Sequence, residues 1–443
     1  MPETHHLRPR AHFTTASTWL NDPNGLVLVD GTYHLFFQTN PDGAVWGTMS
    51  WGHATSQDLI TWVEQPVALR HNGSEAIYSG SVVVDHDNTS GFGEPSDDAP
   101  TLVAVYTSHY EPHAPRGGTE AQSLAWSRDG GTTWTTYPDN PVLDRGSSDF
   151  RDPKVFWHRP TASWVMVAVE ALERQVVVYR SWDLRTWEHA STFGPAGSTE
   201  GVWECPDLFE VPVAGTDGTA WVLVASVGAG GPAGGSGTQW WVGSFDGVTF
   251  APAGAGPPPV RWLDHGPDHY AAVSFDNTPG RRLMVGWAGN WAYATDVPTS
   301  PWVGVMSLAR EVDLVRTSEG PALRQRPVLP AHADVARHTR AVPAEGVATL
   351  TLTTDEGRDP LVVTVDAAAG VLVLDRSRCG DQLGGPFSGV ATAPLVAQAP
   401  AGPTVDVLVV VDGCVVEVYA QGGLVTLTAQ VFPSAMLTTA TWT

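Results

Sequence analysis

Hydrophobic and polar residues alternate in short runs along most of this 443-residue chain. The runs are rich in β-branched and aromatic residues and are bounded by Gly, Pro, Asn or Asp, as is typical of strands separated by turns. In the first two thirds of the chain they span residues 31–38, 79–85, 101–110, 163–171, 175–181, 220–228 and 283–289. No window of a dozen residues carries an apolar stripe at helical spacing with capping residues. The pattern therefore predicts an all-β protein.

A short element recurs where these strands end. Each copy has a serine, an aspartate two residues later and an aromatic residue at its end, which predicts a strand followed by a tight turn with a packed ring. The copies span residues 56–62, 127–134, 181–187 and 244–250, so their serines are 71, 54 and 63 residues apart. Units of this size, each with about four short strands, are typical of β-propeller blades. With a fifth stretch at 264–316 they predict five blades; a β-sandwich with similar turns is the alternative.

The composition changes after the predicted blades. Residues 321–343 are rich in Pro, Ala and Arg, which favours a linker along the surface. Alternating strands follow at 348–354, 361–366, 371–375, 405–411, 415–419 and 424–431, as in a small β-sandwich. We therefore expect a five-bladed β-propeller catalytic domain over 1–320, a linker over 321–343, and a C-terminal β-sandwich with a supporting role over 344–443.

The charge of the chain narrows the choice of partners. Lys and Arg total 24 and Asp and Glu total 47, which gives a formal charge of −23. Such a surface repels nucleic acid and anionic membranes, whereas a small neutral carbohydrate is compatible with it. Three scattered cysteines suit neither a disulfide framework nor a zinc cluster. Since no His-x-x-x-His or comparable ligand set occurs either, we expect no metal and no cofactor.

The first 13 residues contain no apolar segment of the kind found in export signals. No window approaches the ~18 consecutive apolar residues of a membrane-spanning helix. These features predict a cytoplasmic protein, or a secreted one if the native N-terminus lies further upstream. We expect a monomer or a small homo-oligomer.

Three acidic residues stand in structured sequence contexts. Asp22 lies in WLNDPNG (19–25), Asp152 in FRDP (150–153) and Glu204 in WECPD (203–207). They precede the closing serine of their units by 34, 29 and 40 residues, which places them on the first, innermost strands of blades one, three and four. Because inner strands converge on the propeller axis, we expect the three acids to meet at one end of it. Alone, each could instead be a turn former, an ion-pair partner or an ordinary strand residue.

Two carboxyl groups flanking the scissile bond are what glycoside cleavage requires, one ionised and one protonated. In a retaining enzyme this pair lies roughly 5–5.5 Å apart.

The contexts of the three acids resemble, in order and spacing, the signature motifs of glycoside hydrolase family 32. Supporting matches are HLFFQTNP (34–41), WGTMSWGH (46–53), SGS (79–81) and PTSPW (298–302). The resemblance covers the whole chain and implies a five-bladed propeller with a C-terminal sandwich. It also implies that Asp22 attacks the anomeric carbon, Glu204 is the general acid/base and Asp152 stabilises the transition state.

Further residues match positions that contact the sugar in this family. They are Asn21, Gln38, Trp46, Ser79 and Arg151, with Trp287 as a weaker match. The resemblance predicts a retaining β-fructofuranosidase that releases terminal fructose from sucrose, fructo-oligosaccharides or β-fructans of the levan or inulin type. A fructosyltransferase on the same scaffold, a non-hydrolytic sugar-binding propeller and a sialidase are the alternatives. Linkage preference, β-2,1 or β-2,6, stays open at this point.

Overall fold

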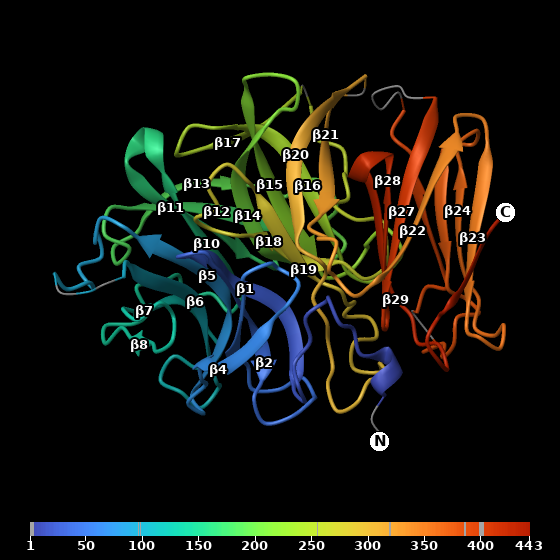
Figure 1. The fold of residues 1–443 in the computed structure, drawn as a ribbon. Helices are drawn as coiled ribbons and strands as arrows, with labels where there is room; N and C mark the ends of the chain where they lie inside the picture. The colour runs from blue at the N-terminus through green and yellow to red at the C-terminus, as the bar shows by residue number, and fades with distance from the viewer. Residues whose placement is uncertain are drawn as a thin grey trace.

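The computed structural model describes residues 4–95, 97, 99–254, 256–318, 320–384, 387–397 and 403–443. Within this part of the chain, antiparallel sheets make up almost the whole fold, and the predicted all-β architecture is confirmed (Figure 1). The short 3₁₀ turns are η1 (His5–Leu7), η2 (Arg159–Thr161) and η3 (Gln421–Gly423). Among the described residues, none lies in a helix long and apolar enough to cross a membrane.

Five sheets of the described chain are successive blades of a propeller. The first blade contains β1 (Trp19–Val29), β2 (Thr32–Asn40), β3 (Ser50–Ser56) and β4 (Val63–Leu69). The second contains β5 (Glu75–Asp85), β6 (Thr101–Tyr110), β7 (Glu120–Ser127), β8 (Thr135–Thr136) and β9 (Leu143–Asp144). The third contains β10 (Phe150–His158), β11 (Ser163–Glu170), β12 (Gln175–Ser181) and β13 (Glu188–Phe193). The fourth contains β14 (Trp203–Pro212), β15 (Thr219–Val227), β16 (Gly237–Phe245) and β17 (Phe250–Pro252). The fifth contains β18 (Tyr270–Ser274), β19 (Leu283–Trp287), β20 (Arg310–Thr317) and β21 (Gly320–Pro327).

The first strands of the blades form a closed ring. β1 contacts β5, β5 contacts β10, β10 contacts β14, β14 contacts β18, and β18 returns to β1. The three acids predicted on inner strands do lie on β1, β10 and β14. Their strands therefore surround one axis although they are up to 182 residues apart in sequence (204 − 22).

The recurring serine–aspartate element forms the same turn in blades one, three and four, and a turn one residue longer in blade two. Asp58 accepts hydrogen bonds from the backbone N–H groups of Ile60 and Thr61, and Asp183 accepts them from Arg185 and Thr186. The carboxylate thus satisfies backbone donors that the turn leaves free.

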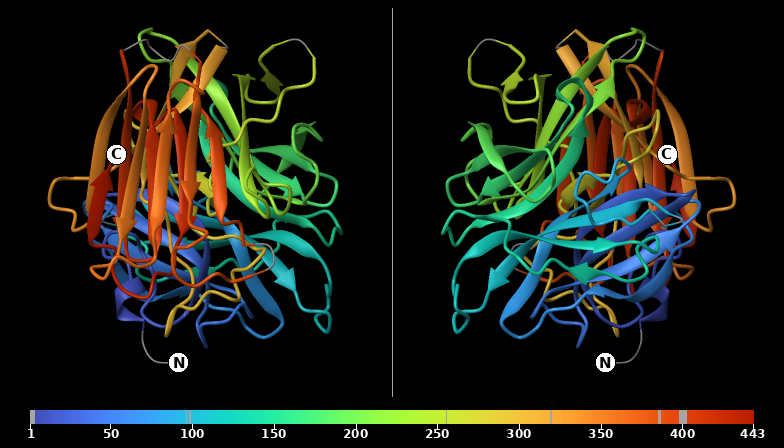
Figure 2. Two further views of the ribbon diagram at one scale, coloured as in Figure 1. Left: turned by 90° about the vertical axis from the view of Figure 1, so that its right-hand side faces the viewer. Right: turned by 90° about the vertical axis from the view of Figure 1, so that its left-hand side faces the viewer.

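The C-terminal domain is a β-sandwich, seen face-on in the left view of Figure 2. One sheet contains β22 (Ala336–Pro343), β27 (Thr404–Asp412), β28 (Val415–Ala420) and β29 (Val425–Gln430). The other contains β26 (Val390–Pro394), β25 (Val371–Asp375), β24 (Leu361–Asp366), β23 (Val347–Thr353) and β30 (Thr439–Trp442). Apolar side chains from both sheets, such as Leu350, Val363 and Val409, fill the space between them.

The structure differs from the predicted linker over 321–343. β21 pairs with β20 as the last strand of blade five, and β22 pairs with β27 in the sandwich. Only residues 328–335 lie between these two strands. The prolines and arginines that suggested a linker stand on partly exposed strands, where composition is a weak guide.

Candidate active site

Every innermost strand of the propeller carries a β-bulge at the level of the acids. The register shifts fall between Leu20 and Pro23, Tyr78 and Gly80, Arg151 and Lys154, Glu204 and Asp207, and Tyr270 and Val273. A bulge bends its strand and redirects a side chain. Asp152, Cys205 and Ala271 have φ angles of 62°, 46° and 53°, a left-handed backbone that is uncommon for residues other than glycine.

Asp22 is held through one of its two carboxylate oxygens. Oδ2 accepts a hydrogen bond from Ser79 Oγ at 2.8 Å and one from the thiol of Cys205 at 3.6 Å. Oδ1 is buried and has no hydrogen-bond partner among the described residues. Burial and the nearby charge of Glu204 raise the pKa of Asp22 above its ordinary value, while interactions with the side chains of Asn21, Ser79 and Cys205 oppose that shift. The carboxylate is thus fixed in place mainly through Oδ2.

Glu204 is held by two donors. Its Oε1 accepts a hydrogen bond from the Arg151 guanidinium at 3.2 Å, and its Oε2 accepts one from the Tyr270 hydroxyl. The side chain is 22% exposed, so a ligand can reach it from solvent. Burial and the charge of Glu204 raise the pKa of Tyr270 well above its ordinary value, which keeps the hydroxyl a donor.

Asp152 is the most enclosed member of the cluster. Its Oδ2 accepts a hydrogen bond from the backbone N–H of Cys205 at 2.8 Å, and its own N–H donates to Thr107 Oγ1. Burial raises the pKa of Asp152, the Arg151 charge lowers it, and the Glu204 and Asp22 charges raise it further. Cys205 therefore contacts both aspartates, and its left-handed backbone positions the donor for Asp152.

Arg151 is the cation of this acidic site. Besides Glu204, it contacts Glu120 Oε2 at 3.0 Å and Asp149 Oδ1 at 3.3 Å. Although burial lowers its pKa, the charges of Glu204, Glu120 and Asp152 raise the pKa of Arg151 well above its ordinary value. The guanidinium partly neutralises the carboxylates of Glu204, Glu120 and Asp152, which would otherwise repel one another.

The predicted sugar-contacting residues occupy different environments. Ser79 and Arg151 contact the acids directly, and Asn21 lies next to Asp22, where its Oδ1 accepts a hydrogen bond from Trp19. Gln38 is buried, and its Nε2 donates to Asn24 and to the Ile77 carbonyl.

The two predicted tryptophans differ in exposure. Trp46 is 50% exposed on the segment between β2 and β3, so its face is open to a ligand. Trp287 is 1% exposed and packs against Tyr270 and Trp291, which leaves no open face for stacking. We therefore correct the expectation for Trp287: it supports the residues beside the acids.

Sequence reasoning missed Tyr270 and Glu120. Tyr270 lies on β18, and Glu120 lies at the start of β7, where it is 3% exposed and also contacts His109. A charged residue at the start of a predominantly buried strand gave no distinctive signal for Glu120. Tyr270 is inseparable by pattern from an ordinary core tyrosine.

Chemically, the arrangement joins three carboxyl groups, one guanidinium and a phenol at one end of the propeller axis. One carboxylate has a free oxygen on rigid backbone, and a second is partly exposed between two donors. Such a pair can combine nucleophilic attack with proton transfer.

Comparisons with known proteins agree on one family. Residues 12–327 match the family described as "Glycosyl hydrolases family 32 N-terminal domain", and residues 329–443 match "Glycosyl hydrolases family 32 C terminal". A levanase of Bacillus subtilis is 49% identical over 72% of this chain and 47% of its own length, so the chain aligns with about half of that enzyme.

Two solved structures cover almost the whole chain. The exo-inulinase of Aspergillus awamori has a TM-score of 0.90 and 35% identity over 98% of this chain and 95% of its own. The β-fructofuranosidase of Schwanniomyces occidentalis complexed with fructosyl-erythritol has a TM-score of 0.86 and 31% identity, covering 98% of this chain and 93% of its own.

Proposed function

The chain belongs to glycoside hydrolase family 32 and is a glycoside hydrolase that acts on fructosides, and we propose that it removes terminal β-linked fructose one unit at a time with retention of configuration. The proposed substrates are sucrose, fructo-oligosaccharides and β-fructans of the levan or inulin type. The similarity to a levanase and to an exo-inulinase supports this range.

The observation that carries the proposal is the state of the Asp22 carboxylate. Ser79 and Cys205 occupy Oδ2, while Oδ1 is buried without a partner among the described residues. An oxygen kept free on rigid backbone is what a nucleophile needs, because it can form a bond without first breaking a hydrogen bond.

In the first proposed step, Asp22 Oδ1 bonds to C2 of the terminal fructosyl unit as the bond from C2 to the leaving oxygen breaks. Glu204 gives its proton to that leaving oxygen. In the second step, Glu204 takes a proton from water, and the hydroxide oxygen displaces Asp22 from C2. Two inversions restore the original configuration.

Asp152 and Arg151 act on charge during these steps. We place Asp152 against the hydroxyl groups of the sugar ring, where its carboxylate stabilises the oxocarbenium-like transition state. Arg151 holds Glu204 at 3.2 Å and compensates the negative charge that Glu204 acquires after protonating the leaving group.

The test is an early product profile combined with one variant. We expect free fructose to be the only small early product from inulin and levan, and fructose with an equal amount of glucose from sucrose. We expect Asp22→Ala to lower kcat by several orders of magnitude in a folded protein. Asp139→Ala changes an exposed aspartate away from the acids and is the matched control. Early release of long oligosaccharides would contradict the exo mode, and a tenth of the activity surviving in Asp22→Ala would exclude Asp22 as nucleophile.

A further inference from the structure

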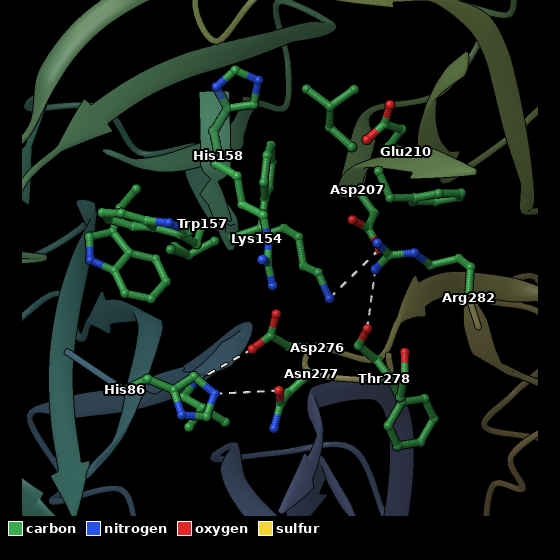
Figure 3. Close-up of a pocket in the computed structure, with 18 of the residues that line it drawn as sticks. His86, Lys154, Trp157, His158, Asp207, Glu210, Asp276, Asn277, Thr278 and Arg282 are labelled. Carbon is green, nitrogen blue, oxygen red and sulfur yellow. Dashed lines mark hydrogen bonds and ion pairs between the residues drawn. The ribbon is translucent and has the colours of Figure 1, made fainter. Parts of the chain in front are cut away.

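A second cavity lies at the opposite end of the inner strands from the acids (Figure 3). It has a volume of about 540 Å³. Lys154 lies two residues beyond Asp152 on β10, and Asp207 lies three residues beyond Glu204 on β14. A space of only about 10 Å³, lined by both Asp152 and Lys154, lies between the two ends. We call the larger space the distal cavity; it is separate from the acids.

Charged side chains of opposite sign converge on the distal cavity. Figure 3 shows Lys154, Asp276 and Arg282 directed toward its middle from three different segments. Lys154 Nζ lies 3.7 Å from Asp207 Oδ2 and donates to the Ser274 carbonyl. Five carboxylates and three Lys or Arg side chains line the distal cavity, so its net charge is negative, which disfavours an anionic ligand.

Two of these buried groups have unused hydrogen-bonding capacity. Asp207 is 0% exposed, and although its Oδ2 accepts a hydrogen bond from the Ser274 N–H, its Oδ1 has no partner among the described residues. Arg282 donates through one terminal nitrogen to Ser274 and Phe275, but its buried Nε also lacks a partner there. Buried polar groups are normally paired. An unpaired acceptor and an unpaired donor in the same cavity therefore indicate a ligand that has both a donor and an acceptor.

Aromatic rings form another part of the wall. Trp157 and Trp164 pack edge-to-face with ring centroids 5.0 Å apart, and Trp221 packs on Phe156. Trp157 and Trp221 are partly exposed. Flat apolar rings beside a few convergent polar groups are typical of small-molecule sites, and the volume lies within their usual range.

From these contacts we propose that the distal cavity is a second, non-catalytic binding site for a neutral saccharide of one or two units. Because Asp207 Oδ1 and Arg282 Nε are both buried, these two side chains turn toward the cavity when the sugar binds. A sugar hydroxyl then donates to Asp207 Oδ1, a sugar oxygen accepts from Arg282 Nε, and a ring face lies against Trp157. The formal charge of −23 also favours a neutral ligand over an anion. The distal site itself does not require the roles proposed for the three acids, but its test rests on the proposed function, because Asp22→Ala is used as a variant that binds sucrose without consuming it.

The test measures sugar bound per chain in a background that does not consume it. Equilibrium dialysis of the full-length Asp22→Ala protein with radiolabelled sucrose should give two molecules per chain. Adding Trp157→Ala or Arg282→Lys should reduce this to one, because each removes a partner in the distal cavity. Adding Trp182→Ala, which alters a half-exposed tryptophan outside the cavity, should leave two.

A crystal of the Asp22→Ala protein soaked in sucrose provides the second measurement. Density for a sugar between Trp157 and Arg282 would support the inference even if a variant failed to fold. An empty distal cavity in that crystal would overturn it. So would equal binding by the Trp157→Ala and Trp182→Ala proteins, or occupation of the cavity by inorganic phosphate but not by sucrose. Because no hydrolysis is measured, failure here is distinguishable from failure of the proposed fructosidase activity.

Discussion

Around Glu204, two fixed donors prepare a carboxyl group for proton transfer. Arg151 and Tyr270 each donate a hydrogen bond to one of its oxygens, so the side chain has little freedom to rotate. The proton must therefore leave or arrive on an oxygen already engaged with the protein. This geometry makes separate predictions for the acid itself and for the residue that positions it.

We expect Glu204→Gln to slow hydrolysis most for substrates whose leaving groups need a proton most. The amide preserves the shape of the side chain but has no acidic proton to give. Hydrolysis of sucrose should fall by at least about a hundredfold, the lower end of typical acid–base contributions. An activated aryl fructoside should lose far less, and initial rates on both substrates provide the measurement. Equal losses would argue against Glu204 as the acid.

Tyr270→Phe removes one of the two donors without removing the acid. We expect kcat to fall about tenfold with little change in KM, the cost of a misplaced catalytic group. Tyr137→Phe, in a half-buried tyrosine of blade two, is the control. An equal loss of kcat in both variants, or a loss expressed in KM alone, would reduce Tyr270 to a packing residue.

At this scale the sequence predicted the acids together with Ser79 and Arg151, and missed Tyr270 and Glu120. Asp22 and Asp152 directly precede a proline, Glu204 lies two residues before one, and Arg151 adjoins Asp152. Tyr270 has no such motif, and its role arises because blade five closes the ring against blades one and four. A contact made by ring closure is not encoded in any local pattern.

Among the elements, the strands and turns followed from local sequence, whereas the bulges did not. Alternation predicts a strand, and the serine–aspartate element predicts its turn. A bulge depends on the register between two strands, which only the paired sheet defines. The five inner-strand bulges at the site could therefore not be predicted from the sequence, although the motifs that lie in several of them could be identified.

The blade turns make a prediction about stability. Asp183 accepts backbone hydrogen bonds at 2.9 and 2.7 Å, and these N–H groups lower the pKa of Asp183 although burial opposes the shift. Asp183→Ala should cost about 1–2 kcal/mol, as the loss of comparable caps does.

Thermal unfolding of Asp183→Ala beside Asp217→Ala, which changes an exposed aspartate, measures this cost. The difference should be present at neutral pH and shrink at acidic pH, since a depressed folded-state pKa gives stability that is lost as the carboxylate protonates. Equal melting temperatures at neutral pH would show that the turn does not need its aspartate.

For the whole molecule, the two domains were predicted but the way they join was not. The boundary contains a buried polar network in which Arg310 contacts Asp264 at 2.9 Å and Glu417 at 3.3 Å. Arg376 pairs with Asp268 at 2.7 Å in the same interface. These partners are 46 to 108 residues apart, so no local pattern reveals them.

His12 extends this network to the N-terminal segment. Its Nδ1 lies 2.8 Å from Asp412 Oδ2, and its Nε2 lies 3.3 Å from Glu417 Oε1. Burial lowers its pKa, but the two carboxylates outweigh burial and raise the pKa of His12 to about 9. The imidazolium therefore links the start of the propeller to the sandwich at neutral pH.

The pH dependence of stability tests this link. A folded-state pKa raised above the unfolded value near 6.5 gives stability that is complete below pH ~6.5 and lost as the pH rises through about 9. The wild-type melting temperature should therefore fall across that window, by the equivalent of at most about 3 kcal/mol. His12→Gln should be less stable at pH 6.5 and approach the wild type by pH 9.5, whereas His113→Gln, an exposed control, should follow the wild type throughout. Only a charged imidazolium makes the difference in melting temperature between His12→Gln and the wild type depend on pH. If the two curves of melting temperature against pH were parallel, the charge of His12 would not contribute to stability.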